Sequence, residues 1–326
     1  MDMARDFKNY QQTNTVDGPN IPSDLTGPRL RIAIGIATKG RAMILAKTLA
    51  DVAQQRRMPD RVVVCCTSPE DVAGVGPDAI SGGPPVEFLE SEPGSCAQRN
   101  RIIDAAKNCD IIFFMDDDFI MEPAYLAATE QAFLADPHLV VSTGTVLADG
   151  INGKGLGIDE ARAILSNNTL TSDARLRNRP VFSGYGCNMA IRAPVALAKG
   201  LRFDERLPLY AWQEDVGLSR ALARHGAVVR LAAARGVHLG TKMGRGPGRK
   251  LGYSQMVNPI HLVQASGGTY PVHYALLRMV KNLLANAARS VTPEPWIDRR
   301  GRLSGNLLGL ADLFRGRVDP GRALNL

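Results

Sequence analysis

Short apolar runs alternate with amphipathic segments through the first half of the chain. The runs cover residues 30–37, 61–66, 86–89 and 110–115. The first, second and fourth are largely hydrophobic, as strands buried on both faces are, and 86–89 (VEFL) is expected to be a short third strand. Helical segments are expected between them, from the turn at 38–41 to about Gln55, over 96–108 with Ser95 as the N-cap, and from Pro123 to about Ala135. This alternation predicts an α/β fold, with a mostly parallel sheet and helices on both faces.

The second half of the chain is less regular. Residues 149–180 mix Gly, Asn and charged side chains and are expected to form an inserted loop, whereas 181–192 and 227–231 read as strands and 213–225 as a helix. The Gly-rich segment 242–250 (KMGRGPGRK) predicts a mobile basic loop. An amphipathic helix is predicted over 272–289, because apolar residues recur there at helical spacing: Val272, Leu276, Met279, Val280, Leu283 and Ala287.

Length and composition fit one large globular domain with an extension. The chain has 326 residues, 45% of them hydrophobic and 22% charged. We expect a loose arm at 1–28, an α/β domain at 29–240, and a basic loop with a helical extension at 241–326. The five cysteines form no CxxC pair, which favours buried thiols in a cytoplasmic protein, and neither a signal peptide nor an apolar run long enough to span a bilayer is evident.

The positive charge is concentrated in the C-terminal part. Residues 235–326 hold 14 Lys and Arg against 4 Asp and Glu, whereas the whole chain has 39 against 32 and a net charge of +7. Such a field attracts phosphates, acidic glycans, anionic lipid or nucleic acid, although a single Lys or Arg is most often only solvated. A nucleic-acid-binding protein is disfavoured because the basic residues lack interleaved aromatics and a recognition motif.

Three consecutive carboxylates follow the fourth apolar run. Asp116, Asp117 and Asp118 stand where ligands bind in open α/β sheets, and stacking three like charges is costly without a cation. A hard divalent ion, Mg²⁺ or Mn²⁺, suits this site. In an extended segment Asp116 and Asp118 point the same way and Asp117 the opposite way, so a DxD pair is the expected unit. The alternative is a solvated acidic turn.

Two further motifs offer chemistry. Glu214 and Asp215 begin the helix predicted at 213–225, where a carboxylate suits a general base, although acids at a helix start also serve as simple caps. His238 follows the strand expected at 227–231. It is a candidate to complete the metal shell or to bind a diphosphate, with a purely structural histidine as the alternative.

Taken together, these motifs resemble the family-2 glycosyltransferases of the GT-A fold over about residues 30–240. The resemblance rests on four segments in order: ATKGR at 37–41, GSCAQRNRIIDAA at 94–106, DDD at 116–118 and QED at 213–215. It implies an inverting transferase that moves a sugar from a nucleotide-diphosphate donor to a hydroxyl of a glycan or lipid-linked acceptor, with Mn²⁺ or Mg²⁺ as cofactor. Synthesis of a bacterial surface polysaccharide would suit such an enzyme.

The resemblance also implies roles for individual residues. Asp118 would hold the metal with Asp116 and His238, and Asp215 would be the base beside Glu214, which would hold acceptor hydroxyls. The donor and nucleotide would contact Thr38, Arg41, Arg99, Asn100, Asp116 and Asp117. The segment 184–188 (GYGCN) would form the floor under the transferred sugar, so that the sugar and acceptor pocket would include Gly184, Tyr185, Asn188 and Trp212. A lid over the diphosphate would present Arg245, Arg249 and Lys250.

One position departs from the family pattern. The family usually ends its second strand with an acidic residue that reads uracil, whereas here that strand ends VCCTS, with acids only at Glu70 and Asp71. Glu90 or Glu92, after the third strand, are the candidates to substitute. UDP is favoured as the nucleotide, but the second strand offers no acidic residue to read its uracil ring.

Rival functions fit the sequence less well. A sugar-nucleotide nucleotidyltransferase normally has a Gly-rich basic loop after the first strand, where this chain has only TKGR, and an Asp-dependent phosphatase carries its carboxylates after the first strand. An inactive GT-A-like polyanion-binding protein would not explain the retained acidic motifs. For the helix at 272–289 we expect packing on the catalytic domain, with a homodimer contact or peripheral contact with the inner face of the plasma membrane as alternatives.

Overall fold

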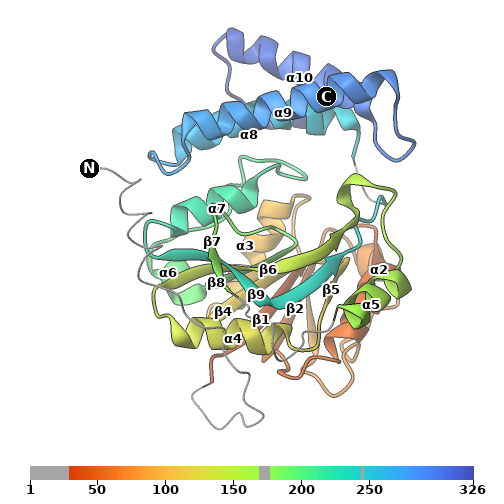
Figure 1. Cartoon of the computed structure of the whole chain (residues 1–326), viewed down its shortest axis with the longest axis vertical. Coiled ribbons are helices and arrows are strands. Elements are labelled where there is room, and N and C mark those ends of the chain that lie inside the picture. Colours follow the sequence, from red (N-terminus) through yellow and green to blue (C-terminus); the bar gives the residue numbers. More distant parts are fainter. Residues whose placement is uncertain (1–28, 169–176, 244–245) are drawn as a thin grey trace.

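The structure is a computed structural model that describes residues 29–168, 177–243 and 246–326. The arm expected at 1–28 and the lid candidate Arg245 lie outside the described residues. The described chain is built on a nine-stranded sheet (Figure 1). Its strands are β1 (Ile32–Ala37), β2 (Arg61–Cys66), β3 (Val86–Glu90), β4 (Ile111–Asp116), β5 (Phe119–Met121), β6 (Leu139–Asp149), β7 (Arg179–Pro180), β8 (Asn188–Arg192) and β9 (Ala227–His238).

The sheet is mixed and mostly parallel in its first half. Its order is β3-β2-β1-β4-β8-β6-β9-β5, with β7 pairing on β9. Strands β1 to β4 are the four that the sequence predicted. They pair in parallel, so their carboxyl ends meet at one edge of the sheet. Strand β8 runs antiparallel between β4 and β6, and β6 pairs in parallel with β9. The predicted fold class is confirmed.

Helices cover both faces of the sheet. They are α2 (Ala42–Val52), α3 (Ser95–Ala105), α4 (Tyr125–Ala135), α5 (Ile158–Asn167), α6 (Ala193–Ala198), α7 (Glu214–Leu222), α8 (Gly248–Ala265), α9 (Val272–Val291) and α10 (Arg299–Phe314). One core joins the sheet to α3, α6 and α7, and the other joins it to α2 and α4. Figure 1 shows α8, α9 and α10 as a further layer beyond α7. Leu262 of α8 and Ala275 of α9 belong to the α7 side of the core.

Several local expectations were wrong. Gly94, not Ser95, is the N-cap of α3, and Ser95 is its first residue. Helix α4 begins at Tyr125 after Ala124, so Pro123 precedes the helix and does not occupy its first turn. The stretch 149–180 contains helix α5, and β6 was not anticipated at all. Strand β9 continues to His238, well past the expected 227–231.

The basic Gly-rich segment is not wholly a loop. Helix α8 begins at Gly248, so Arg249 and Lys250 are helical. The Lys250 ammonium donates a hydrogen bond to the Leu324 carbonyl (2.7 Å), which fixes it to the C-terminal end of the chain. The expectation of a mobile loop therefore fails for the last three residues of 242–250.

Helix α9 is confirmed as a helix, but its predicted apolar stripe faces the core only in part. Met279 of the stripe is buried and Leu283 and Ala287 are partly buried, whereas Val272, Leu276 and Val280 are about half exposed. Within the described part of the chain, no helix is long and apolar enough to cross a membrane. The five cysteines are buried and unpaired, as expected.

Candidate functional site

Two carboxylates and one imidazole converge at the end of β4. Asp116 is the last residue of β4, Asp118 lies in the turn to β5, and His238 ends β9. One ligand atom from each of the three lies within 4.8 Å of the others. His238 Nε2 lies 3.3 Å from Asp118 Oδ1 and 3.8 Å from Asp116 Oδ2. The DxD arrangement predicted from the alternation of side chains is therefore present.

The donor set fits a hard divalent cation. Two carboxylates and one imidazole are ligands that Mn²⁺ accepts, and Mg²⁺ accepts the carboxylates. Asp118 Oδ2 accepts a hydrogen bond from the Thr241 amide (2.7 Å), whereas the buried Asp118 Oδ1, which lies 3.3 Å from His238 Nε2, has no hydrogen-bond partner among the described residues. An unpaired carboxylate oxygen in a buried position is costly unless a cation completes it. These three residues could hold the metal.

A residue that the sequence reading missed orients His238. Asp149, at the end of β6, lies beside His238 in the strand register. Its Oδ1 is 2.9 Å from His238 Nδ1. Tyr185 donates its hydroxyl to the other Asp149 oxygen (2.9 Å). A carboxylate on Nδ1 leaves Nε2 facing Asp116 and Asp118, as an outer-shell partner does in metal sites. Asp149 ends β6, a strand that was not predicted, so the signal that identified Asp116 was not available for it.

The electrostatics show how strongly these groups are coupled. Burial lowers the pKa of His238, but its contacts with the carboxylates of Asp118 and Asp149 outweigh it and raise that pKa to about 10. Burial raises the pKa of Asp118, yet His238 and Arg41 bring it down to about 2. The cluster thus requires positive charge, which a proton on His238 or a divalent cation can supply.

Asp117 faces the other way, as predicted, and ties down the turn after β1. Its carboxylate accepts hydrogen bonds from the Thr38 hydroxyl (2.6 Å) and from Arg41 Nη1 (2.9 Å). Burial raises the pKa of Asp117 to about 6, against the opposing charge of Arg41. Arg41 Nε also donates to the Met243 carbonyl (2.9 Å), so the turn contacts the segment that follows His238.

Asp71, in the short 3-10 helix at Pro69–Val72 that follows β2, stabilises the same region. Its two oxygens accept hydrogen bonds from the amides of Gly40 (2.6 Å), Thr67 (2.8 Å) and Ser68 (3.1 Å), and from the Thr67 hydroxyl (2.7 Å). Gly40 has a φ of 65°, a conformation that favours glycine. Asp71 therefore holds the two loops at the ends of β1 and β2 together.

Arg99 joins the two acidic motifs. This buried side chain on α3 forms an ion pair with Glu214 through Nη1, and with Asp116 through Nη2 (3.1 Å). Nη2 also donates to the Gly186 carbonyl (3.0 Å), and the guanidinium lies 5.4 Å from the centre of the Phe203 ring. The DDD and QED motifs, about 100 residues apart in the chain, therefore meet across one guanidinium.

Asp215 lies beside this bridge at the start of α7. Its oxygens accept hydrogen bonds from the amides of Gly186 (2.8 Å) and Val216 (2.7 Å). Burial and the neighbouring charge of Asp215 raise the pKa of Glu214 to about 8, against the lowering effect of Arg99. Burial also raises the pKa of Asp215. Two acids with raised pKa values in one site are suited to accepting protons.

The loop before α7 is strained. Leu209, Ala211 and Gln213 all have positive φ values, of 56°, 49° and 72°, which cost non-glycine residues about 1–3 kcal/mol each. Contacts from three directions hold the loop. The Ser95 amide donates to Leu209 O, Asn258 Nδ2 to Trp212 O, and Tyr270 OH to Gln213 Oε1. Trp212 stacks on the exposed Tyr210, and its buried indole nitrogen has no hydrogen-bond partner in the part of the chain that the structure describes.

The segment 184–188 passes between the acidic groups. Gly186 contacts Asp215 and Arg99 through its backbone, and the Cys187 carbonyl accepts the Asp116 amide (3.1 Å). Gly184 packs against Met189 and donates its amide to Ser219. Asn188 is fully buried and accepts a hydrogen bond from Thr143 (2.6 Å). Tyr185 and Gly186 are therefore the members of this segment that touch the acidic groups or their partners.

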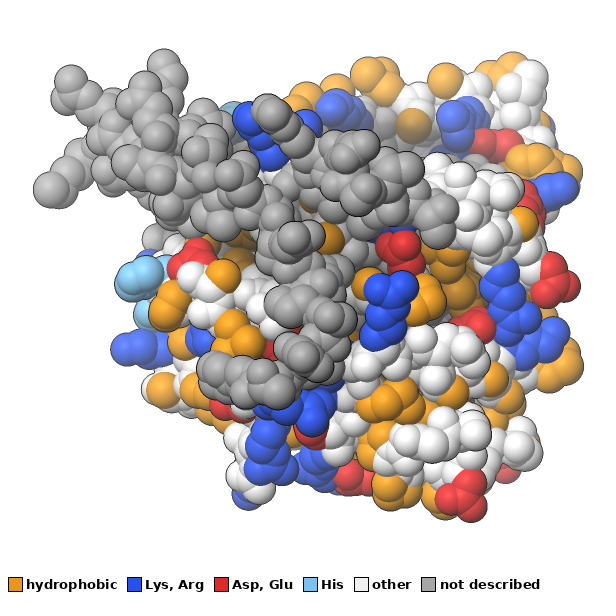
Figure 2. Space-filling model, turned by 60° about the horizontal axis from the view of Figure 1, so that its bottom comes forward, with side chains coloured by type: hydrophobic (Ala, Val, Ile, Leu, Met, Phe, Trp, Pro, Cys, Tyr) orange, Lys and Arg blue, Asp and Glu red, His pale blue; other side chains and the backbone are white. Residues whose placement is uncertain are grey.

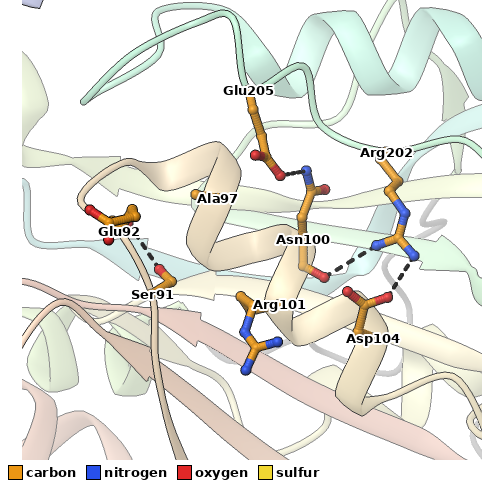
Figure 3. A pocket seen from close by; sticks show the side chains of 8 residues that line it. All are labelled: Ser91, Glu92, Ala97, Asn100, Arg101, Asp104, Arg202 and Glu205. Atoms are coloured by element: carbon orange, nitrogen blue, oxygen red, sulfur yellow. Dashed lines mark hydrogen bonds and ion pairs between the residues drawn. The ribbon is translucent and has the colours of Figure 1, made fainter.

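Other expected site residues lie apart from this cluster. Asn100 donates to Phe203 O (3.0 Å) and Glu205 (2.7 Å), and it lines a pocket of about 420 Å³ along α3 with Glu92, Arg101 and Arg202 (Figure 3). None of the metal-binding candidates lines this pocket. Arg249 is exposed on α8, and Lys250 binds the Leu324 carbonyl as described.

Comparisons with known proteins agree on one family. A family profile described as "Glycosyltransferase like family 2" matches residues 28–238. The mannosyltransferase PcManGT from Pyrobaculum calidifontis, solved with GDP-Man and Mn²⁺, has 14% identity and a TM-score of 0.54, over 95% of this chain and 94% of that one. GalNAc-T7, solved with UDP, GalNAc and Mn²⁺, has 14% identity and a TM-score of 0.56, over 93% of this chain and 57% of that one. A search of curated proteins found no match.

Proposed function

This chain belongs to glycosyltransferase family 2 and has the GT-A fold, and we propose that it transfers a sugar with inversion from a nucleotide-diphosphate donor to an acceptor hydroxyl. The observation that carries the proposal is the bridge by Arg99, which places a candidate metal site and a candidate base on either side of one guanidinium. A solvated acidic turn or a simple helix cap would not need an arginine that joins the two acidic motifs.

We assign Asp116, Asp118 and His238 to the cation, Mn²⁺ or Mg²⁺. When bound, the cation would neutralise charge on the donor diphosphate and on the nucleoside diphosphate that leaves. The two structural neighbours were solved with Mn²⁺, which is consistent with this assignment. Asp149 would fix the ring of His238 for this purpose.

We assign the base role to Asp215. In a single displacement the acceptor oxygen forms a bond to the anomeric carbon while the bond from that carbon to the phosphate oxygen breaks. The acceptor proton passes to Asp215, and the diphosphate leaves with the bonding electron pair. The raised pKa of Asp215 suits a group that must accept a proton. Glu214, held by Arg99, would contact acceptor hydroxyls.

Thr38, Arg41 and Asp117 form the side of the site where we place the nucleotide. Their hydrogen bonds fix the turn after β1 at the same edge of the sheet as Asp116. UDP remains the favoured nucleotide as a prediction, and the neighbours carry both GDP-Man and UDP. A glycan or lipid-linked acceptor, in surface polysaccharide synthesis, is likewise a prediction.

The test is calorimetric titration of UDP, GDP and their sugar conjugates, with Mn²⁺ and with a chelator. We expect one nucleotide class to bind only with Mn²⁺, and Asp118→Asn to abolish that binding. Asp104→Asn is the matched control, because Asp104 lies on α3 in an exposed ion pair with Arg202. Equal binding by Asp118→Asn and the control would refute the metal assignment. Failure of every nucleotide to bind would refute the transferase proposal.

A further inference from the structure

Helix α9 carries an apolar stripe that no described part of the chain covers. Val272, Leu276, Leu277, Val280 and Leu284 are between 48% and 63% exposed. Apart from the adjacent pair Leu276 and Leu277, they follow one another at intervals of three or four residues, so they share one side of the helix. The side that packs on the neighbouring helices is formed by Ala275, Met279 and Asn286. The more hydrophobic side of α9 is therefore the one that faces outward.

Basic side chains border this stripe. Lys281 and Arg278 are exposed on α9, and Arg278 donates to the Tyr274 hydroxyl (2.8 Å). Two of the nearby acids are paired within the protein, because Glu294 binds Arg289 and Arg299, and Asp312 binds Arg322. Asp298 accepts hydrogen bonds from the amides of Gly248 and Gly301. The outer surface of the C-terminal helices thus combines exposed apolar residues with uncompensated positive charge.

We propose that α9 docks on the surface of an anionic lipid bilayer, with its axis in the plane of the interface. An amphipathic helix with a basic border and an apolar face has the chemistry for this position, where apolar burial and attraction to anionic headgroups add. A second copy of the chain is the competing occupant. It would bring two positively charged borders together, whereas anionic lipid complements them.

The opposite end of the molecule carries charges of both signs. Figure 2 brings the bottom of the view in Figure 1 forward, and on the part of that face that is not grey, acidic, basic and hydrophobic side chains are interspersed. In Figure 1, α9 lies in the outer helical layer, away from α4. A bilayer would therefore orient the protein through the C-terminal helices.

The region around α9 is tied to the loop that leads into α7. Asn258 of α8 binds the Trp212 carbonyl (3.0 Å), and His261 binds Asp204 (2.8 Å). Tyr270, two residues before the start of α9, binds Gln213 (2.6 Å) next to Glu214. A membrane that holds α9 would thus set the orientation of the acceptor side of the site relative to the lipid surface.

The test is flotation of the full chain with vesicles of phosphatidylglycerol and phosphatidylcholine, compared with phosphatidylcholine alone. The double variant Leu277→Gln/Leu284→Gln removes two apolar contacts one above the other on the stripe, and we expect it to lose at least roughly tenfold in binding. Ala285→Gln is the matched control, exposed on the other side of α9, and should bind as wild type. Lys281→Gln should lose about fivefold, which corresponds to ~1 kcal/mol per basic residue near an anionic surface.

Wild-type protein that floats with anionic vesicles and not with phosphatidylcholine alone would support the proposal. It would be overturned if wild type bound neither vesicle, or if the double variant bound as well as Ala285→Gln. Conversion of a dimer to a monomer by the double variant, measured by sedimentation, would also overturn it in favour of self-association. Nucleotide binding measured on the same variants keeps this outcome separate from the transferase proposal.

Discussion

Replacing Arg99 by Gln should destabilise the protein more than any exposed ion pair on the same helix. The Arg99 side chain is 6% exposed and its partner Glu214 11%, so the change leaves a buried carboxylate without its counter-charge. Loss of one member of a buried pair costs about 3–5 kcal/mol. Asp116 is 35% exposed, so water screens much of that second pair and it adds little. We therefore expect a loss of about 3–4 kcal/mol in the free energy of unfolding.

The matched control is Arg202→Gln, because Arg202 pairs with Asp104 of α3 and both side chains are at least 40% exposed. An exposed pair contributes less than about 1 kcal/mol, so this variant should remain close to wild type in urea unfolding followed by tryptophan fluorescence. The double variant Arg99→Gln/Glu214→Gln replaces two opposite charges by two amides and should recover about 2 kcal/mol of the loss.

The effect of Arg99→Gln should also depend on pH. Burial and Asp215 raise the pKa of Glu214, and Arg99 opposes that rise, so the variant raises it further. A carboxyl with a raised pKa in the folded state binds more protons folded than unfolded, so stability falls as pH rises from the unfolded pKa of about 4.5 toward the folded one. The deficit of Arg99→Gln should therefore be larger above pH 8, where Glu214 of the wild type is ionised and pairs with Arg99, than near pH 5. A deficit within about 0.5 kcal/mol of that of Arg202→Gln at both pH values would refute the reasoning.

Three further outcomes are expected. Asp149→Asn removes the carboxylate that orients His238 and should weaken Mn²⁺ binding about 10–100-fold in calorimetry, whereas Tyr185→Phe should change it only a few-fold. The rate of transfer should fall on acidification at a pH above the usual carboxyl pKa of about 4, because the pKa of Asp215 is raised, and Asp215→Asn should abolish turnover while donor binding persists. Tyr270→Phe should lower kcat several-fold without changing donor KM, and a loss in donor KM instead would refute a positioning role.

The first half of the fold could be predicted because its signals are local. Strands β1, β2 and β4 are largely apolar runs followed by polar residues, and that pattern alone indicates burial on both faces. The same feature placed Asp116 and Asp118 at the carboxyl edge of the sheet, and the period of two separated them from Asp117. Strand periodicity therefore predicted both the element and the direction of its side chains.

The parts that were not predicted depend on distant partners. Strand β6 contains Ser142, Thr143 and Gly144, polar or small residues that look unlike a buried strand until β8 and β9 enclose them. At Gly144 an added Cβ would meet the Tyr125 hydroxyl and the Ala234 carbonyl at 2.4–2.5 Å, so the glycine is set by close packing. Ser95 is a favourable N-cap residue, but its amide pairs with Leu209 O. Ser95 is therefore the first residue of the helix, and Gly94 is the N-cap.

Helix α9 shows that periodicity fixes a helix but not the direction in which its stripe points. The recurring apolar positions from Val272 to Ala287 predicted the helix, and a stripe of that kind usually faces a core. Here the face toward α8 and α10 is built on polar contacts: Asn286 binds Gln255 (2.9 Å) and Asn306 (2.8 Å). A buried amide network satisfies that side, so the apolar residues are left facing outward.

The strained loop at 209–213 connects these observations. Three residues with positive φ cost the fold several kcal/mol, so the loop keeps its shape only because its surroundings determine it. Two of its anchors, Asn258 and Tyr270, come from the C-terminal helical region and not from the sheet. The loop leads directly into Glu214, whose position sets the Arg99 bridge. The C-terminal helices therefore act on the site through backbone geometry, and disturbing them should reach the acids of α7 before it reaches the metal-binding residues on β4 and β9.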